Sequence, residues 1–455
     1  MASGKNEGSQ GKVLNMTEGS PLRLILMFMV PVLLGQLVQQ TYNMVDAMIV
    51  GRMLGADALA SVGSSSSVQF MMLGFVSGAS DGFAITVAQR FGAKDYRNLR
   101  RYAWHSLILA AVFSAVIAAA GSMATPAIIT ALKVPSAIRN GAIAYLMILF
   151  LGIPCSFFYN ILASLLRAIG NSRIPFIFLT AAAVMNIFLD LLCVAVFGLG
   201  VAGAAIATVT SQALSGVFCL VYILKHERLL LAGSGERKPD KAIFGKLVSM
   251  GVPMGLQFSI TAIGSMVMQA ANNSLGSIYV SGFTAGDRVE QFFMCPYVGL
   301  SSSVATYVGQ NYGAMKFGRI RQGVRASIIM AHIYGLIFGS LVALTGEAAA
   351  AWFLPAGSDR IVAISGQFLR LVGFSLFLVS SVNVYRPAMQ GLGEPLKAIL
   401  SGVVEMCART LFATLTLRYL GFTTICLTHQ AAWISAGIYV FLMYHAVIRK
   451  KEGQT

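Results

Sequence analysis

A short segment occurs twice in this chain. Val87-Ala-Gln-Arg-Phe-Gly-Ala returns 221 residues later as Val308-Gly-Gln-Asn-Tyr-Gly-Ala, and each copy follows an apolar run and precedes a group of basic residues. Self-similarity over such a long period indicates that the chain is two copies of one unit. Residues that differ between the copies therefore mark the places where specialised chemistry is expected.

The repeated unit is predicted to lie in a membrane. Hydrophobic residues make up 56% of the chain and charged residues 11%, and the mean hydropathy is +0.74. Apolar stretches of about 20 residues, each long enough to cross about 30 Å of hydrocarbon as a helix, recur about twelve times between Pro21 and Val447. We therefore expect an all-α integral membrane protein with twelve transmembrane helices.

The two copies divide the chain into two lobes. The one long polar interruption contains Gly233-Ser-Gly-Glu-Arg-Lys-Pro and separates them. The predicted divisions are a disordered cytosolic tail (1–20), an N-lobe with helices 1 to 6 (21–224), a cytoplasmic linker (225–243), a C-lobe with helices 7 to 12 (244–447) and a second cytosolic tail (448–455). Because each copy has an even number of spans, the lobes share one topology, which predicts two pseudo-symmetric six-helix bundles around a V-shaped cleft.

The net charge of +16 could indicate a nucleic-acid-binding protein. The positions of the basic residues distinguish this possibility from the charge pattern of a membrane protein. These residues gather in alternate loops, which include Arg97 to Arg101, Lys225 to Lys246 and Arg319 to Arg325. By the positive-inside rule these loops and both termini are cytoplasmic, which predicts a multi-pass protein of the cell (plasma) membrane that does not bind nucleic acid. The tail 1–20 has no apolar core and so does not resemble a signal peptide.

The first predicted helix carries a polar stripe. Its members are three and four residues apart, which places them on one helical face: Gln36, Gln39, Asn43 and Asp46. Such a stripe is expected to face protein or a water-filled cavity, because these groups are costly to expose to lipid. Hydrogen bonding between helices explains the Gln and Asn residues equally well, whereas the intramembrane carboxylate of Asp46 indicates function.

Two later predicted helices carry further polar groups that could bind an ion together with Asp46. Asn186 and Asp190 are four residues apart on one face, and Thr208, Ser211 and Ser215 offer neutral oxygens. Buried carboxylates can exchange protons, and carboxylate, amide and hydroxyl oxygens also suit a hard monovalent cation. The sequence leaves H⁺ and Na⁺ both open as the ion.

The second half does not repeat the acidic set. Met268 falls opposite Asp46, and a neutral stripe begins at Gln257, so the ion site is expected in the first half. Glu405 and Arg409 are four apart and are expected to pair, while Glu290 is equally consistent with ion pairing and with binding a cationic substrate. The residues assigned to a substrate cavity are Gln39, Asn43, Gln257, Glu290 and Arg409.

The remaining reactive residues give no metal or catalytic pattern. The six cysteines lie singly in or beside apolar spans, and the five histidines are scattered. Paired Asp-rich motifs, which a membrane-embedded transferase would need, are absent from the sequence. We therefore predict that the protein is not an enzyme and has no cofactor.

Several motifs together resemble the MATE (multidrug and toxic compound extrusion) family, from about Pro21 to Val447. They are the doubled Gln-x-x-Gly-Ala, Asp46 with Gly51 and Gly55, Leu166-Arg-Ala-Ile-Gly, Asn186-x-x-x-Asp190, Gly203-Ala-Ala-Ile-Ala-Thr-Val-Thr-Ser-Gln212 and Gly286-Asp-Arg-Val-Glu290. The resemblance implies efflux of amphipathic, often cationic, organic compounds in exchange for H⁺ or Na⁺, with no obligate protein partner.

The resemblance also implies a cation-coupling site in the N-lobe. Its matching positions are Asp46, Tyr145, Asn186, Asp190 and Thr208, and bound Na⁺ would be held by four of these, Tyr145 excepted. Some members of the family carry a coupling carboxylate in helix 7, where this chain has the neutral stripe from Gln257. The alternative within transporters is a lipid-linked oligosaccharide flippase of a related doubled fold, although such proteins often carry more arginines in the cavity.

Overall fold

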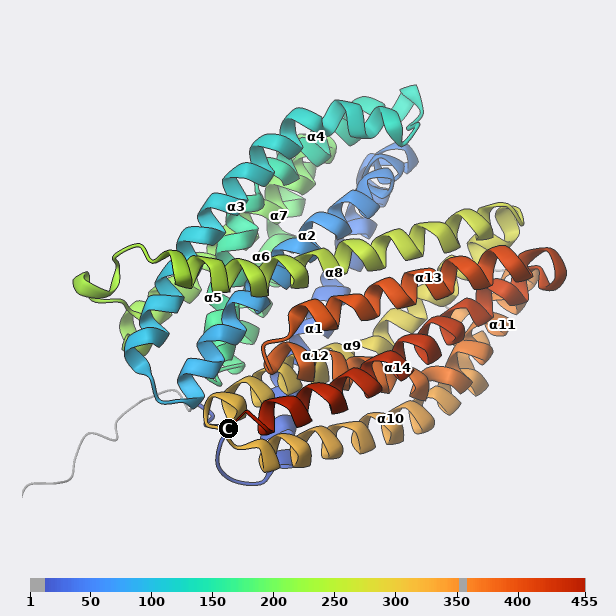
Figure 1. The fold of residues 1–455 in the computed structure, drawn as a ribbon. Helices are drawn as coiled ribbons and strands as arrows, with labels where there is room; N and C mark the ends of the chain where they lie inside the picture. Colours follow the sequence, from blue (N-terminus) through green and yellow to red (C-terminus); the bar gives the residue numbers. More distant parts are fainter. Residues whose placement is uncertain (1–12, 352–357, 455) are drawn as a thin grey trace, which may run out of the picture.

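The computed structural model describes residues 13–351 and 358–454, and within these ranges the chain forms helices and no strand (Figure 1). The N-lobe contains α1 (Pro21–Leu54), α2 (Ala56–Gly92), α3 (Tyr96–Ala131), α4 (Ser136–Leu151), α5 (Ile153–Ala168), α6 (Arg173–Asp190), the π-helix η1 (Leu191–Val196) and α7 (Gly200–His226). The linker contains the short turns η2 (Arg228–Leu230) and η3 (Ser234–Glu236). The C-lobe contains α8 (Lys241–Asn273), α9 (Ser277–Gly313), α10 (Phe317–Ala351), α11 (Asp359–Ser375), η4 (Leu376–Leu378), α12 (Val379–Gly391), α13 (Pro395–Leu420) and α14 (Phe422–Glu452).

The helices are long and apolar enough to confirm the all-α membrane fold. In the described ranges, ten helical segments are long and apolar enough to cross a membrane. Helices α4 and α5, which meet at an angle of 45°, would together form an eleventh span. The remaining long helix, α9, has 37 residues, the same length as α2. It packs against α1, α2, α10, α11 and α12.

The duplication predicted from the repeated segment is visible in the helix lengths. α1 and α8 have 34 and 33 residues, α2 and α9 have 37 each, and α3 and α10 have 36 and 35. Each lobe also has one interrupted span at the same place, α4 to α5 at Gly152 and α11 to α12 at η4. Figure 1 shows the lobes in contact on the side of the termini and α4 standing apart from α11 and α13 at the other side.

Glycines let α2 of the N-lobe lie directly against α8 of the C-lobe. Gly74, Gly78 and Gly82 are spaced four apart and form one smooth face of α2. A Cβ at Gly82 would lie 2.6 Å from the Gly251 Cα, and one at Gly74 would lie 2.7 Å from the Phe258 Cβ. Small residues at a four-residue spacing allow close backbone approach, so this interface depends on them.

The predicted tail 1–20 is wrong for residues 13–20. Met16 is fully buried, and its backbone N–H donates to the Gln310 side chain over 2.9 Å. Its carbonyl accepts from Asn311. The segment is ordered because the bundle both buries the Met16 side chain and satisfies its backbone. Residues 1–12 lie outside the described ranges.

The C-terminal tail also differs from expectation, because α14 continues to Glu452. Basic residues in its last turn, Arg449 to Lys451, favour this extension through the helix dipole. The start of α10 contacts both chain ends, since Lys316 donates to the Thr17 carbonyl and Arg321 pairs with Glu452. Both described ends therefore lie on one side of the bundle.

The linker is held on α3 by ion pairs. Arg100 contacts Glu236 at 2.6 Å, and Arg101 contacts Asp240 at 2.7 Å. The hydrogen bond from Arg100 lowers the pKa of Glu236 to about 2. Because a lowered pKa keeps this carboxyl ionised at any physiological pH, the contact between linker and α3 is insensitive to pH in that range.

A buried ionic group lies between α12 and α13 of the C-lobe. Glu405 pairs with Arg409 at 2.7 Å, as the sequence predicted, and also with Arg386 at 3.0 Å. Glu405 and Arg409 are both 7% exposed. Two guanidinium groups thus share one carboxylate, and none of the three charges has ready access to water.

We predict that Gly82→Val destabilises the protein by about 1–3 kcal/mol, because the added atoms overlap α8. The measurement is SDS-induced unfolding of the purified protein in mixed micelles. Gly63→Val is the matched control on α2, since a Cβ at Gly63 meets no atom within 4 Å. Equal stabilities for the two variants would contradict the assigned role of the glycine face.

We predict that Glu405→Gln lowers the free energy of unfolding by about 3–5 kcal/mol, because it leaves two buried arginines uncompensated. The same unfolding measurement checks it. Glu347→Gln is the control, because the Glu347–Arg370 pair is 3.6 Å long with both side chains more than half exposed, and such pairs contribute about 0–1 kcal/mol. A small effect at Glu405 would show that this ionic group does not stabilise the lobe.

Candidate ion-coupling site in the N-lobe

One close approach between α1 and α6 sets the register of the two N-lobe aspartates. A Cβ at Gly35 would lie 3.5 Å from the Leu179 side chain, so the helices touch there. Asp46 follows Gly35 and Asp190 follows Leu179 by the same number of residues, about three turns. Because both helices run away from the side of the termini, the two carboxyl groups arrive at the same depth.

The two carboxyl groups lie within electrostatic range of each other. Asp190 is fully buried, and neither of its oxygens has a hydrogen-bond donor among the described residues. The Asp46 Oδ1 atom is likewise buried without a donor there. Two facing carboxylates repel, so this arrangement calls for a shared proton or a bound cation.

Tyrosines and a change of helix type surround the pair. Tyr42 and Tyr145 lie within electrostatic range of both aspartates, and Tyr145 is 2% exposed. Directly after Asp190 the chain changes to the π-helix η1, over Leu191–Val196. Such π-helical turns occur often at functional sites, because they shift side chains out of the regular α-helical register.

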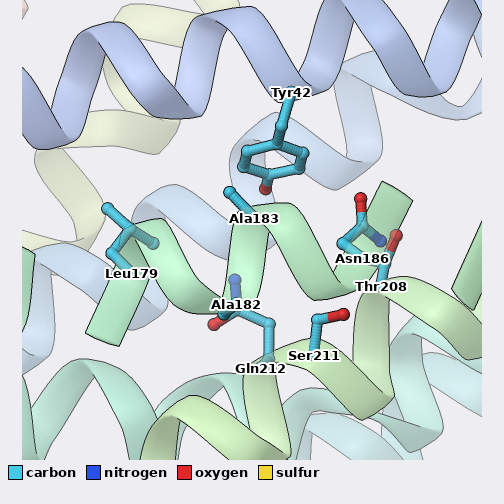
Figure 2. Close-up of a pocket in the computed structure, with 8 residues that line it drawn as sticks. All are labelled: Tyr42, Leu179, Ala182, Ala183, Asn186, Thr208, Ser211 and Gln212. Carbon is cyan, nitrogen blue, oxygen red and sulfur yellow. The ribbon is translucent and has the colours of Figure 1, made fainter. Parts of the chain in front are cut away.

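A small pocket lies between α1, α6 and α7 and reaches Asn186, four residues before Asp190 (Figure 2). Its lining residues are Tyr42, Leu179, Ala182, Ala183, Asn186, Thr208, Ser211 and Gln212. Figure 2 shows the Tyr42 ring pointing from α1 toward α6, with Asn186 and Thr208 close to each other. The Asn186 side-chain oxygen and nitrogen, the Ser211 hydroxyl and the Gln212 oxygen are buried without partners in the described structure. Unpartnered buried oxygens are unusual and indicate a site for water or a small ion.

The structure therefore brings together the whole coupling set predicted from the sequence. Asp46 and Asp190 meet, Tyr145 lies near them, and Asn186 and Thr208 line the adjoining pocket. Two polar pocket residues, Tyr42 and Gln212, were not named among the candidate groups of the site. Helical spacing was the available signal, because Tyr42 precedes Asp46 by four residues and Gln212 follows Thr208 by four.

The five residues assigned to a substrate cavity lie in different settings. Gln39 is half-buried and Asn43 exposed on α1, while Gln257 accepts a hydrogen bond from Gln390 at 2.9 Å. Glu290 and Arg409 are buried inside the C-lobe. The Glu290 Oε1 atom lies 3.9 Å from the His429 Nδ1 atom, and Arg409 belongs to the ionic group with Glu405. The structure thus separates the partly exposed residues of α1 from buried C-lobe residues.

Asp81 has a local structural role. Its carboxylate accepts from Arg167 at 2.9 Å and from Ser164 at 2.7 Å, which joins α2 to α5 within the N-lobe. Among the described residues, no group of three or more His, Cys, Asp or Glu side chains is arranged to hold a metal ion. The predicted coupling set consists of two carboxyl groups and neutral side chains.

Comparison with known proteins agrees with this architecture. The chain is 27% identical over 434 residues to "Probable multidrug resistance protein YpnP" of Bacillus subtilis, covering 95% of this chain and 97% of that protein. It is 23% identical to "Multidrug export protein MepA" of Staphylococcus aureus, covering 85% and 86%. The relatives thus match along nearly the whole length of both chains.

Solved structures show the same fold. An outward-facing multidrug resistance MATE family transporter of the MOP superfamily superposes with a TM-score of 0.91 at 23% identity, covering 98% of this chain and 99% of that one. A MOP superfamily transporter from Pyrococcus furiosus superposes with a TM-score of 0.92, also at 23% identity, covering 98% and 99%. The MatE family model matches twice, over residues 31–192 and 253–415, once in each lobe. The chain therefore belongs to the MatE family of transporters, as its motifs suggested.

Proposed function

We propose that this protein exports amphipathic, often cationic, organic compounds in exchange for inward H⁺ or Na⁺, and that Asp46 and Asp190 couple the two movements. The observation that carries the proposal is that the carboxyl groups of Asp46 and Asp190 lie within electrostatic range of each other, while both Asp190 oxygens and the Asp46 Oδ1 atom are buried without a donor in the described structure. A charge pair without compensation is costly within a membrane, which gives the loaded and empty forms different free energies. Relatives named as multidrug resistance and multidrug export proteins support the substrate class.

The proposed coupling step acts through charge. One proton or one monovalent cation between Asp46 and Asp190 removes their repulsion and draws α1 toward α6, the helices that carry them. Loss of the ion restores the repulsion between the carboxylates and favours a state in which α1 and α6 lie farther apart at this site. Binding of the ion thus changes the relative stability of two states of the N-lobe, which is what exchange of substrate and ion requires.

The neighbouring oxygens suit either ion. Asn186, Ser211 and Gln212 each present a buried oxygen without a partner, and the Thr208 hydroxyl already donates to the Ala204 carbonyl at 3.0 Å. Na⁺ would take carboxylate, amide and hydroxyl oxygens as ligands, whereas a proton would need only the two carboxyl groups. H⁺ and Na⁺ remain alternatives at the same site.

The substrate path is proposed to lie between the lobes. Gln39 and Asn43 on α1 and Gln257 on α8 offer neutral polar contacts, and Glu290 offers a carboxylate deeper in the C-lobe. Varied organic substrates are suited to adaptable apolar contacts, for which methionine and aromatic side chains serve well. We place the protein in the plasma membrane with both termini cytoplasmic, as the distribution of basic residues predicts.

We predict that Asp46→Asn and Asp190→Asn each abolish gradient-driven drug efflux, because one ionisable carboxyl cannot form the charge-switching pair. The measurement is drug transport into inverted vesicles under an imposed pH gradient or an imposed sodium gradient, each alone. Wild-type activity is expected with one gradient and identifies the ion. Efflux by Asp46→Asn with an unchanged ion dependence would contradict the proposed role.

Asp287→Asn is the matched control for this experiment. It removes an intramembrane carboxylate of the C-lobe, which accepts a hydrogen bond from Gln291, and leaves the N-lobe pair intact. Its response to each gradient is expected to match the wild type. If Asp287→Asn loses gradient dependence while Asp46→Asn keeps it, coupling resides in the C-lobe.

A further inference from the structure

The repeated Gln-x-x-Gly-Ala segment forms a reciprocal contact between the lobes. Gln89 on α2 donates to the carbonyl of Gly391 at the end of α12, over 2.9 Å. Its counterpart Gln310 on α9 donates to the carbonyl of Ala168 at the end of α5, also over 2.9 Å. Each glutamine thus crosses from its own lobe to the equivalent helix end of the other lobe.

The glycines of the same segment make this crossing possible. A Cβ at Gly92 would overlap the Gln310 carbonyl, and a Cβ at Gly313 would overlap the Gln89 carbonyl. The ends of α2 and α9 are therefore in backbone contact, and each copy of the motif supplies the glycine that the glutamine residue of the other copy approaches. Two hydrogen bonds and two glycine contacts form one structure, which we call the clasp (Gln89, Gly92, Gln310 and Gly313).

The N-terminal segment reinforces one side of the clasp. The Gln310 Oε1 atom accepts from the Met16 backbone, while its Nε2 atom donates to Ala168. Leu14 donates to the Gly170 carbonyl of the N-lobe, and Lys316 of the C-lobe donates to Thr17. The segment therefore connects both lobes over the clasp, and Gln310 has more bonds to lose than Gln89.

The clasp lies on the side where the lobes meet. Both described chain ends are there, and the lobes diverge toward the other side (Figure 1). Rocking that opens this side must pull α2 from α9, and so must break both glutamine hydrogen bonds and both glycine contacts. No such rearrangement is needed for ion contacts in the N-lobe pocket, which is lined by α1, α6 and α7.

We propose that the clasp closes the cytoplasmic side of the transport path and that Gln89 and Gln310 are positioning residues for transport, setting how readily the inward-open state forms. This rests on the proposed exchange of substrate across two lobes. The contact has two copies of one motif because the pseudo-symmetry places equivalent segments face to face. The repeat is then retained as a gate, rather than only as a connector within each lobe.

The test measures the distance between spin labels on the two lobes in the purified full-length protein, with its native cysteines replaced. Tyr96→Cys and Gly318→Cys report on the clasp side, and Met53→Cys with Ser277→Cys report on the other side; all four positions are exposed. Gln89→Ala should raise the ratio of open to closed clasp by about 2- to 10-fold, as expected for one neutral hydrogen bond. Gln310→Ala should raise it more, and the double variant by about 10-fold or more.

Gly92→Ala tests the same gate by different chemistry, since it keeps both glutamines and prevents backbone contact. It should lengthen the distance on the clasp side and shorten it on the other. Gln367→Ala is the control for loss of a side-chain amide, because Gln367 bonds Thr423 within the C-lobe, and Gly63→Ala is the control for an added methyl group. Both controls should retain the wild-type distances.

The proposal is overturned if the double glutamine variant and Gly92→Ala are folded and keep the wild-type distance distributions. If one of these two variants does not fold, the other variant and Gln89→Ala are judged together, and wild-type distances in both overturn the proposal. The measurement needs neither drug nor ion gradient, so it is independent of the coupling role of Asp46. Suppose that Asp46→Asn keeps normal efflux while the glutamine variants open the clasp. That result would contradict the coupling proposal and support the proposal that the clasp is a gate.

Discussion

The hydrocarbon layer of a membrane contains no water, and this constrains most features of the protein. Backbone groups must be paired within each segment, so the membrane part can only be helical. Polar side chains must find partners inside the bundle, as Glu405 does with two arginines and Asp81 with Arg167 and Ser164. Asp46 and Asp190 differ from these groups, because they lie near each other and have buried oxygens without donors in the described structure.

The duplicated helical scaffold and the aspartate site, which occurs in one lobe, have separate physical origins. Two similar lobes can meet face to face through equivalent segments, and the glycine-lined contacts of α2 with α8 and α9 use this symmetry. The N-lobe aspartates break it, because the position opposite Asp46 holds Met268 in the C-lobe. The proposed ion site thus lies in one lobe, whereas the contacts between the lobes are duplicated.

Much of the fold could be predicted from residue patterns, because apolar stretches in lipid have few alternatives to a helix. The repeat indicated two lobes, in each of which the family model matches once, and the four-residue spacing of Glu405 and Arg409 predicted their pairing. Arg386, the other partner of Glu405, could not be predicted, since it comes from a different helix. The order of residues 13–20 was also missed, because a polar sequence does not reveal that the bundle buries Met16 and bonds its backbone.

The sequence alone determined that this is a doubled helical membrane protein with acidic and amide residues on particular helix faces. Helical periodicity is local, so it can be read without knowing what lies opposite each face. Only the tertiary structure decided that Asp46 faces Asp190, that a pocket adjoins them, and that Gln89 and Gln310 cross between the lobes. Those relations depend on how helices distant in sequence pack, at close approaches such as Gly35 against Leu179.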